Sequence, residues 1–570
     1  MAFLLVFTVL LPLVGSLILF GSPHLPTRTA RSFALAITLV TMALSLALLA
    51  AFRPEVVGAQ FAFAGSDGKI GLGWLPRYGV RFALGLDGIS LWLFALTSLL
   101  MITSVFASWE SVTERAPAHY GLLLALQTGL LGLFASLDVV LFYIFFEFTL
   151  IPLFFLIGLY GGPERRRASV TFFLYTLAGS LLTLLGVIAL VAVYYQHTNP
   201  HILTFSIPEL TEGLKQIQWD EWTTARTWGD WKADKPFWMT PQVLIFMLLF
   251  AGFAIKVPLF PFHTWLPLAH VEAPTAGSIL LAGVMLKVGS YGFLRFNMAM
   301  TPIGAQALMP LMATLSVIGI LYGALAALAQ TDVKRLVAYS SVSHMGFIIL
   351  GLFSLNSTGI DGAVIQMINH GITTGALFAC VGVIYERYHT REMSELSGLW
   401  KRLPLWAFFF ILASLGSAAL PGLNGFVGEF PILLGMFRAD RIYAILATLG
   451  MILGAYYLLL MLQKVVFGPL KEPASHGHHH DAHDAGSSHG GVRPVGWHEI
   501  AGLTPLMVLI VLIGVYPKPF LDRIKPPLVP IAAQFDRAPA PAPAPTPATV
   551  AAGPGGFAVP GAAPITIIGD

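Results

Sequence analysis

Long apolar runs and polar segments alternate along this chain, and each apolar run is about as long as one helix. Runs of about 20 predominantly apolar residues, the length that crosses a hydrocarbon core as an α-helix, follow one another from residues 3–20 to residues 502–515. Mostly short polar loops separate them. The pattern predicts about fourteen transmembrane helices, so the expected fold is an all-α, polytopic membrane protein.

Composition agrees with this pattern. Of the 570 residues, 56% are hydrophobic and 11% are charged, so apolar sequence exceeds what a soluble core encloses. The first apolar run has no lysine or arginine before it and no small-residue cleavage pattern after it, so we expect it to be retained as a helix. Cys380 is the only cysteine in the sequence and cannot supply the ligands of an iron–sulfur cluster. Any redox centre is therefore expected on another chain.

Basic residues predict the orientation of the helices. The net charge is only +3, which gives no reason to expect nucleic-acid binding. Lysines and arginines gather in loops after the first, fifth, ninth and eleventh predicted spans, which the positive-inside rule makes cytoplasmic. Both termini would then face outward. The loops concerned contain Arg28 and Arg31, residues 165–167, Lys334 and Arg335, and residues 387–402.

The chain also contains an internal repeat. SLDVVLFYIFFE, which begins at Ser136, aligns with QTDVKRLVAYSS, which begins at Gln330, at an offset of 194 residues. Each unit holds five predicted spans, an odd number, so the second must be inverted relative to the first. The predicted segments are residues 1–112 (three N-terminal spans), 113–300 (first repeat, with a polar insertion at 196–235), 301–470 (second repeat), 471–498 (a His-rich loop), 499–516 (a last span) and 517–570 (a Pro/Ala-rich tail).

One span in each repeat is predicted to be broken. In KVPLFPFHTWLP, Pro258 has no N–H for the carbonyl of Ala254, and Pro261 extends the disruption. In the second repeat, Pro421 leaves the carbonyl of Ser417 without its helical donor. Unpaired carbonyls are tolerated in hydrocarbon only where they line a wet cavity, so paired breaks favour a hydrated site over plain proline kinks. The predicted break residues are Pro258, Pro261, Pro421, Gly422 and Gly425.

Four ionisable groups lie inside or beside these apolar spans. Glu147 is eight residues into its run, roughly 12 Å deep at 1.5 Å per residue. An ionised side chain at mid-membrane costs about 2.5 to 3.5 kcal/mol on the lenient insertion scale, which argues for function rather than stability. The alternative is a buried ion pair that only holds helices together. The candidate proton-transfer groups are Glu147, Lys256, Lys287 and Glu429.

Histidines are candidate relays between these groups, because their unperturbed pKa lies near neutrality. His344 in YSSVSHMGF and His370 in QMINHGITTG lie within apolar spans of the second repeat. A lone buried histidine is more often a structural residue, and that reading stays open here. His263 and His270 flank the first break, where they are expected to act either as relays or as caps of exposed carbonyls.

Several motifs together carry a family resemblance. They include LGLDGISL, FYIFFEFTLIP, KVPLFPFHTWLPLAHVEAPTAGS, AGVMLKVGSYGFLR, TDVKRLVAYSSVSHMGF, INHG, YERYHTREMSELSGLW and LPGLNGFVGEF, between about residues 84 and 464. With these motifs the sequence resembles the antiporter-like membrane subunits of respiratory complex I, the proton-pumping NADH:quinone oxidoreductase. The resemblance implies fourteen spans in two inverted five-helix units, within a bacterial cytoplasmic (inner) membrane.

The resemblance also implies roles for the buried groups. Glu147 would pair with Lys256, Lys287 would pass protons towards His344 and His370, and Glu429 would end the path. In the L- and N-type branches of the family the position of Glu429 is lysine, so Glu429 separates this chain from them. Neighbouring L- and N-type chains are the implied partners. Flavin and iron–sulfur clusters are implied on other subunits, with no cofactor or metal on this chain.

Two polar segments fall outside the resemblance. The loop KEPASHGHHHDAHDAGSSHGG, residues 471–491, contains six histidines, but a solvated low-complexity loop is favoured over a metal site. The tail RAPAPAPAPTPATVAAGPGGFAVPGAAP, residues 537–564, favours extended polyproline-like backbone. Neither segment contributes a predicted proton-transfer residue.

The predicted function is proton translocation driven by electron transfer in other subunits. One alternative is a subunit of a multisubunit cation/proton antiporter or a membrane-bound hydrogenase, which would share the helices but differ in partners. A second alternative is a passive membrane scaffold whose buried ion pairs only pack helices.

Overall fold

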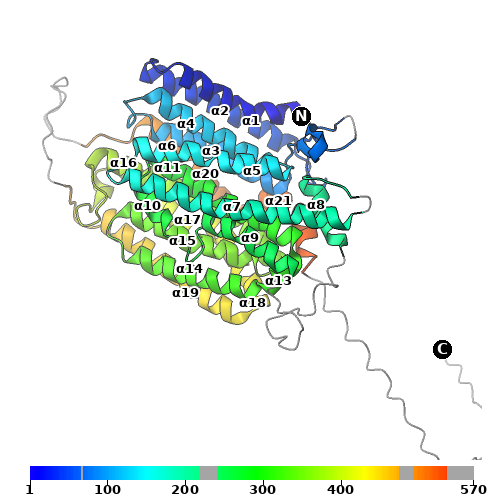
Figure 1. Ribbon diagram of the computed structural model, residues 1–570. Helices are drawn as coiled ribbons and strands as arrows, with labels where there is room; N and C mark the ends of the chain where they lie inside the picture. Colours follow the sequence, from blue (N-terminus) through cyan, green and yellow to red (C-terminus); the bar gives the residue numbers. More distant parts are fainter. Residues whose placement is uncertain (66–67, 199–200, 218–239, 474–491, 536–570) are drawn as a thin grey trace, which may run out of the picture.

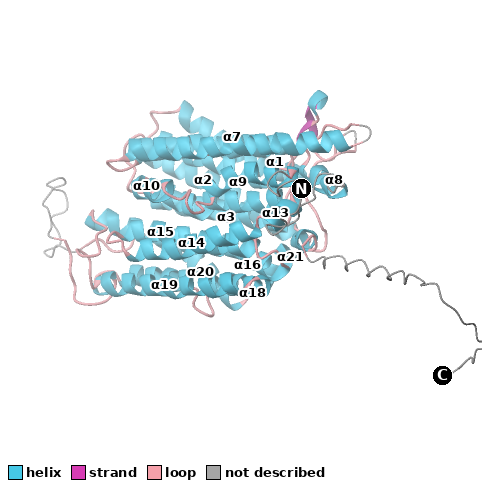
Figure 2. Ribbon diagram, turned by 60° about the horizontal axis from the view of Figure 1, so that its bottom comes forward, coloured by secondary structure: helices cyan, strands magenta, loops and turns pink. Residues whose placement is uncertain are grey.

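The structure, a computed structural model, describes residues 1–65, 68–198, 201–217, 240–473 and 492–535. Long helices run side by side, and their loops gather at the two ends of the bundle (Figures 1 and 2). The helices and strands, in chain order, are α1 (Ala2–Gly21), α2 (Thr27–Ala51), β1 (Leu72–Leu75), η1 (Pro76–Tyr78), β2 (Val80–Phe82), α3 (Gly88–Ala107), α4 (Ala116–Ala135), α5 (Val139–Phe148), α6 (Leu150–Tyr160), α7 (Arg165–His197), α8 (Ile207–Gln216), α9 (Pro241–Lys256), α10 (Trp265–Glu272), α11 (Thr275–Leu280), η4 (Leu281–Met285), α12 (Leu286–Gly292), η5 (Phe293–Met298), α13 (Pro302–Ala307), α14 (Met309–Leu328), α15 (Val333–Leu352), α16 (Ser357–Tyr388), η6 (Leu399–Lys401), α17 (Pro404–Ser417), α18 (Asn424–Ala439), α19 (Arg441–Val465), α20 (Trp497–Val515) and α21 (Lys518–Ala532).

The predicted membrane-spanning character is confirmed by these helices. Within the described residues, 12 helical spans are long and apolar enough to cross a membrane. Two shorter apolar helices, α9 and α17, are followed closely by α10 and α18. The prediction of about fourteen crossings requires each of these two pairs to cross once, and this count stays a prediction.

Both predicted breaks separate two helices. Between α9 and α10 the chain leaves helical geometry from Val257 to Thr264, and between α17 and α18 it does so from Ala418 to Leu423. The expectation that Pro258 leaves the carbonyl of Ala254 unpaired is wrong. The backbone N–H of Leu259 donates to it at 2.9 Å, because the chain widens by one residue and presents the next donor.

The span that carries Lys287 is irregular in another way. Two π-helical segments, η4 and η5, flank α12. Such wide turns occur mostly as single insertions within α-helices and frequently at functional sites. Lys287 is the second residue of α12 and therefore follows η4 directly.

The repeat is visible at two helix starts. Asp138 caps α5 by accepting from the backbone N–H groups of Val140 and Leu141, and Asp332 caps α15 by accepting from that of Arg335. These aspartates align in the sequence repeat. α5 begins near α8, whereas α15 begins near α10, at the opposite end of the bundle (Figure 1). Opposite placement is what an inverted repeat requires, while the exact segment boundaries stay predictions.

The structure adds elements that the hydrophobic pattern did not predict. A small antiparallel hairpin, β1–β2, lies in the loop before α3 and pairs Leu72 with Phe82 and Leu75 with Val80 across a register shift. The polar insertion contains α8, and the segment predicted as the start of a Pro/Ala-rich tail contains α21. α21 lies at the same end of the bundle as the N-terminus (Figure 1). The six histidines of residues 471–491 and most of the tail lie outside the described residues.

Candidate functional site

Glu147 and Lys256 face the same part of the first repeat without forming an ion pair. Lys256 is the last residue of α9 and is 2% exposed. Its Nζ lies 4.5 Å from the centre of the Phe146 ring, a cation–π contact. Neither Lys256 Nζ nor Glu147 Oε1 has a hydrogen-bond partner, although Glu147 lies within electrostatic range of Lys256. The lysine is thus held next to its predicted partner but is not neutralised by direct contact.

Local sequence explains where Glu147 stands. Glu147 lies in the last turn of α5, and Thr149 interrupts the helix before α6 begins. Pro152 contributes to the interruption because it has no N–H to offer the carbonyl of Phe148. Glu147 is therefore placed beside a discontinuity in its span.

Lys287 and His370 are in direct contact at the centre of the molecule. Lys287 is fully buried, and its Nζ lies 2.6 Å from His370 Nδ1 and 2.5 Å from the carbonyl oxygen of Ala282. His370 comes from α16, so this contact joins the first repeat to the second. His370 Nε2 has no partner and is available to a further donor or acceptor.

His344 connects His370 to Glu429. The ring centres of His344 and His370 are 5.6 Å apart. His344 Nδ1 lies 2.8 Å from Glu429 Oε1, and both residues are buried. Lys287, His370, His344 and Glu429 therefore follow one another, with hydrogen bonds at both ends and a ring contact between the two histidines, while no hydrogen bond or ion pair among the described residues joins Lys256 to Lys287.

Polar neighbours orient the last two members of this series. Gln366 donates from Nε2 to Glu429 Oε1 at 3.0 Å. His344 Nε2 lies 3.2 Å from the hydroxyl of Ser417 and 3.4 Å from that of Tyr457. A cavity of about 10 Å³ adjoins His344 and Glu429, which is about the smallest space that holds one water.

Sequence reasoning missed these neighbours. Gln366 had a signal, since it precedes His370 by four residues in QMINHG and so lies on the same helix face. Ser417 and Tyr457 had none, because a hydroxyl within an apolar span is common and its partner comes from another helix. They are found only when the fold brings α15, α17 and α19 together.

His263 and His270 are buried on either side of α10's start. The ring of His270 stacks on Phe378 at 4.6 Å, and neither of its nitrogens has a hydrogen-bond partner. His263 packs against Phe260 and Tyr322. Among the described residues, no hydrogen bond joins either ring to a carbonyl, so the capping role predicted as an alternative is not observed.

The five predicted break residues have different places. Pro258 and Pro261 lie between α9 and α10, and Pro421 and Gly422 lie between α17 and α18. Gly422 has a φ of +89°, a left-handed value that favours glycine. Gly425 is instead the second residue of α18, where a Cβ would collide with the carbonyl oxygen of Gly416. Its role is close packing rather than breaking the helix.

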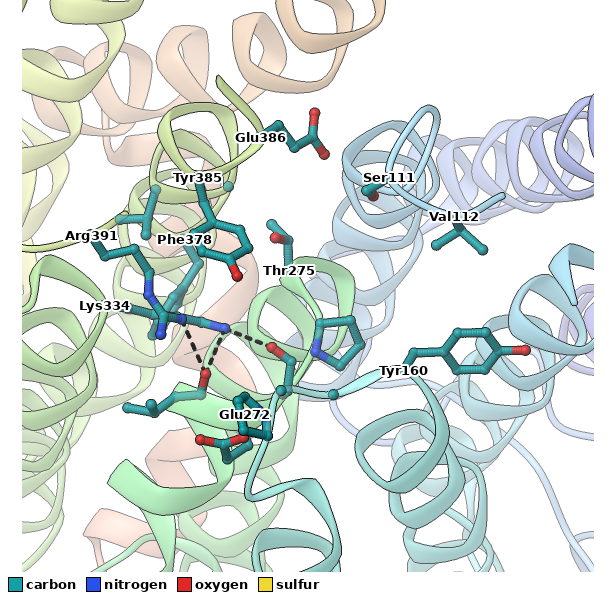
Figure 3. Close-up of a pocket in the computed structure, with 18 of the residues that line it drawn as sticks. Ser111, Val112, Tyr160, Glu272, Thr275, Lys334, Phe378, Tyr385, Glu386 and Arg391 are labelled. Carbon is teal, nitrogen blue, oxygen red and sulfur yellow. Dashed lines mark hydrogen bonds between the residues drawn. The ribbon is translucent and has the colours of Figure 1, made fainter. Parts of the chain in front are cut away.

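A cavity of about 410 Å³ opens at the end of the bundle where α10 ends and α15 begins (Figure 3). Lys334, predicted as a loop cation, is instead buried and donates to the carbonyl oxygens of Val271 and Ala273 at 3.2 and 2.6 Å. Arg391 also donates to Val271. These cations satisfy the C-terminal carbonyls of α10, where the negative end of the helix dipole favours positive charge. Val271 and Phe378, the neighbours of His270, line the same cavity.

A second predicted loop cation is also buried in a specific contact. Arg387 forms a bidentate pair with Glu499, with nitrogen–oxygen distances of 2.7 and 2.8 Å, and this pair anchors the start of α20 to the end of α16. Among the described residues, no group of three or more His, Cys, Asp or Glu side chains could hold a metal ion.

Comparisons with known proteins agree on one family. Residues 136–454 match the family described as NADH:quinone oxidoreductase/Mrp antiporter, TM. The chain is 41% identical to NADH-quinone oxidoreductase subunit M of Rhodobacter capsulatus, over 89% of this chain and 91% of that one. It is 38% identical to NADH-ubiquinone oxidoreductase chain 4 of Chondrus crispus, over 91% and 96%. A chain of respiratory complex I from Thermus thermophilus, solved with bound NADH, superposes with a TM-score of 0.77 at 32% identity, over 93% of this chain and 99% of that one.

Proposed function

Because the chain belongs to the NADH:quinone oxidoreductase/Mrp antiporter family of membrane proteins, we propose that it carries protons across the membrane as the M-type (chain 4) subunit of complex I. Electron transfer in other subunits drives the transfer, and this chain performs no redox step. The observation that carries the proposal is the close succession of Lys287, His370, His344 and Glu429, which crosses from one repeat to the other with one gap, between the two histidine rings.

The series has the chemistry of a proton path. Lysine, imidazole and carboxylate each gain or lose a proton, and each contact joins groups that can share one. His370 Nε2 has no hydrogen-bond partner, and the rings of His370 and His344 are 5.6 Å apart without a direct hydrogen bond, so one water or a ring rotation completes the transfer. A structural ion pair would need none of these intermediate groups.

Lys256 and Glu147 supply the element that changes state. A lysine held by a carboxylate stays protonated, whereas a lysine in apolar surroundings favours its neutral form. In this structure Lys256 rests on the Phe146 ring instead of on Glu147, so two arrangements are available to it. Each pKa unit corresponds to about 1.36 kcal/mol, and moving one proton against 100 mV requires about 2.3 kcal/mol. A change of partner worth two or three pKa units therefore suffices to drive one proton.

The cavity beside α10 supports the inlet of this path. His270 stacks on Phe378, which lines the cavity, and Lys287 is within electrostatic range of His270. The basic residues at this end make it the cytoplasmic face. His270 accordingly relays protons from the cavity to Lys287. His263 lies in the break that follows Lys256 and is the candidate relay to that lysine.

The proposal extends to partners and location, which the family resemblance and the basic loops support. The chain is a multi-pass protein of the bacterial cytoplasmic membrane with both termini outside, and its neighbours are the L- and N-type subunits. Flavin and iron–sulfur clusters belong to other subunits. Co-purification with those redox subunits tests this assignment against a cation/proton antiporter or a membrane-bound hydrogenase.

Substitution of Lys256 or Glu147 by alanine tests conduction against a passive scaffold. We expect each variant complex to assemble and to lose most of its proton pumping, measured with a pH-sensitive dye in inverted vesicles during NADH oxidation. Lys401→Ala, an exposed lysine, is the control and should pump normally. Full pumping by both Lys256→Ala and Glu147→Ala would support the scaffold instead.

A further inference from the structure

A second cavity lies at the opposite end of the bundle from the one in Figure 3. Its volume is about 460 Å³, and α16, α18 and α21 form its walls, with the last turn of α20 beside them. None of the proton-path residues lines it. Its chemistry differs from that of the path, because one carboxylate and one ammonium group share a lining that is otherwise mainly apolar.

The position of this cavity is the boundary between hydrocarbon and headgroups. Thr358, at the start of α16, and Gly514, at the end of α20, both line it, and the ends of membrane-spanning helices mark that level. α21 is amphipathic, since Phe520, Ile524 and Leu528 are buried while Lys525 is exposed. An amphipathic helix next to the span ends is typical of a segment that lies in the interface.

Opposite charges stand on two walls of the cavity. Asp361 comes from α16 and Lys525 from α21, and the two lie within electrostatic range of each other. Among the described residues, no side-chain hydrogen bond or salt bridge is formed by either group. Two complementary charges that face one space without neutralising each other fit a ligand that carries both signs a short distance apart.

The third wall is apolar and reaches the membrane side of α18. Phe426 and Phe430 stack with ring centres 5.2 Å apart, and both line the cavity. Phe430 is 49% exposed, so this wall continues onto the outer surface of the helix. An acyl chain that leaves the cavity would lie along these rings.

We propose that this cavity binds one phospholipid with a primary ammonium group, of the phosphatidylethanolamine type, through Asp361, Lys525 and the Phe426–Phe430 wall. The ammonium group donates to the Asp361 carboxylate, the phosphate accepts from Lys525, and an acyl chain lies along the phenylalanines. Phosphatidylglycerol places no cation at Asp361. The quaternary ammonium of phosphatidylcholine has no N–H to donate to the carboxylate.

The test is a count of lipid bound to the purified, intact complex. After detergent washing, native mass spectrometry should show one phosphatidylethanolamine fewer per complex in Asp361→Asn and in Lys525→Gln than in the wild type. Lys518→Gln is the matched control, because Lys518 lies on the same helix but pairs with Asp522 at 2.6 Å and does not line the cavity. NADH oxidation verifies assembly of each variant.

A second measurement does not depend on the folding of variants. Wild-type complex in vesicles that contain a photoactivatable phosphatidylethanolamine should be labelled on α18 and α21, and matched photoactivatable phosphatidylglycerol should label these helices at least fivefold less. Unchanged lipid counts in both variants, equal labelling by the two lipids, or no labelling of α18 and α21 by either lipid would each overturn the proposal.

Discussion

At the scale of single residues, the contact between Lys287 and His370 has the largest consequence. Two basic groups whose nitrogens are 2.6 Å apart cannot both carry a full charge at low cost in a buried site. They therefore share protons as a unit rather than as two independent groups. In the proposed path, a proton that reaches either one would move on towards His344, where the carboxylate of Glu429 attracts it.

Substitution of Glu429 tests whether its carboxylate takes part in the proton path. Glu429→Gln keeps the shape and can still accept from Gln366, but it removes the charge that attracts the proton through His344. We expect proton transfer through this chain to slow by about 10²-fold, the lower end of the contribution of a positioned acid or base. Pumping per NADH oxidised in vesicles measures it. Glu212→Gln, an exposed position on α8, should change nothing, and normal pumping by Glu429→Gln would remove this residue from the path.

Asp138, which caps the start of α5, predicts a pH dependence of local stability. Burial, opposed by hydrogen bonds from the N–H groups of Arg81, Leu141 and Val140, raises its pKa from 3.8 to about 6. The folded state thus binds the proton more tightly than the unfolded state, so stability falls as pH rises from about 4 to 6. The full difference is roughly 3 kcal/mol.

Hydrogen exchange of the first amides of α5, corrected for intrinsic rates, measures this dependence. Protection should be higher at pH 4.5 than at pH 7 in the wild type. In Asp138→Asn it should be independent of pH over that range, because no titrating group remains. An equal pH dependence in the two proteins would assign the effect to another group.

At the scale of elements, the two broken helices determine how the path is arranged. α9 ends at Lys256, and α18 places Glu429 in its second turn, so each break presents one ionisable group at the start or end of a half-helix. Sequence located both breaks because each combines a proline with a second proline or with glycines in a span that is otherwise apolar. It did not locate the donor for Ala254, since that donor depends on the path of the chain after the proline.

Lys334 stabilises the C-terminal end of the half-helix α10 through two hydrogen bonds. Lys334→Met would leave the carbonyls of Val271 and Ala273 without this donor, and an unsatisfied buried carbonyl costs about 1 to 3 kcal/mol. We expect the free energy of local opening of α10, measured by hydrogen exchange, to fall by about 2 kcal/mol. The loss is not larger because Arg391 still donates to Val271.

Two variants separate this role from a general loss of charge. Lys334→Arg retains a cation with several donors and should restore most of the protection of α10. Arg335→Met removes the adjacent cation, whose side chain is exposed, and should leave α10 unchanged. If Lys334→Met exchanged like the wild type, Lys334 would be a solvated loop cation after all.

At the scale of the whole molecule, sequence predicted the fold class and the family, and the comparisons confirm both. The apolar runs are reliable because helices in lipid must satisfy their own backbone hydrogen bonds. The same pattern could not predict β1–β2, α8 or α21, which lie at the ends of the bundle where water competes and periodicity is short. α21 was also hidden by its prolines, which usually argue against a helix.

The charged groups also divide into residues that the sequence identified and contacts that it did not predict. Glu147, Lys256, Lys287, His344, His370 and Glu429 were found because ionisable groups are rare in apolar spans. Their order in space was not fixed by sequence, since His344 and His370 lie in different helices and meet only through packing. Lys334 and Arg387 were misjudged for the opposite reason, because basic residues next to loops are usually solvated.

Proton transfer along these buried groups requires water between them, and a cryo-EM map of the assembled complex that resolves ordered water tests this most directly. We predict water that connects Lys256 to Lys287 and His370 Nε2 to His344, with further water from His270 to the cavity at the end of α10. Dry side-chain packing across the space between Lys256 and Lys287, with no rotamer of either lysine that reaches the other or a shared water, would contradict it.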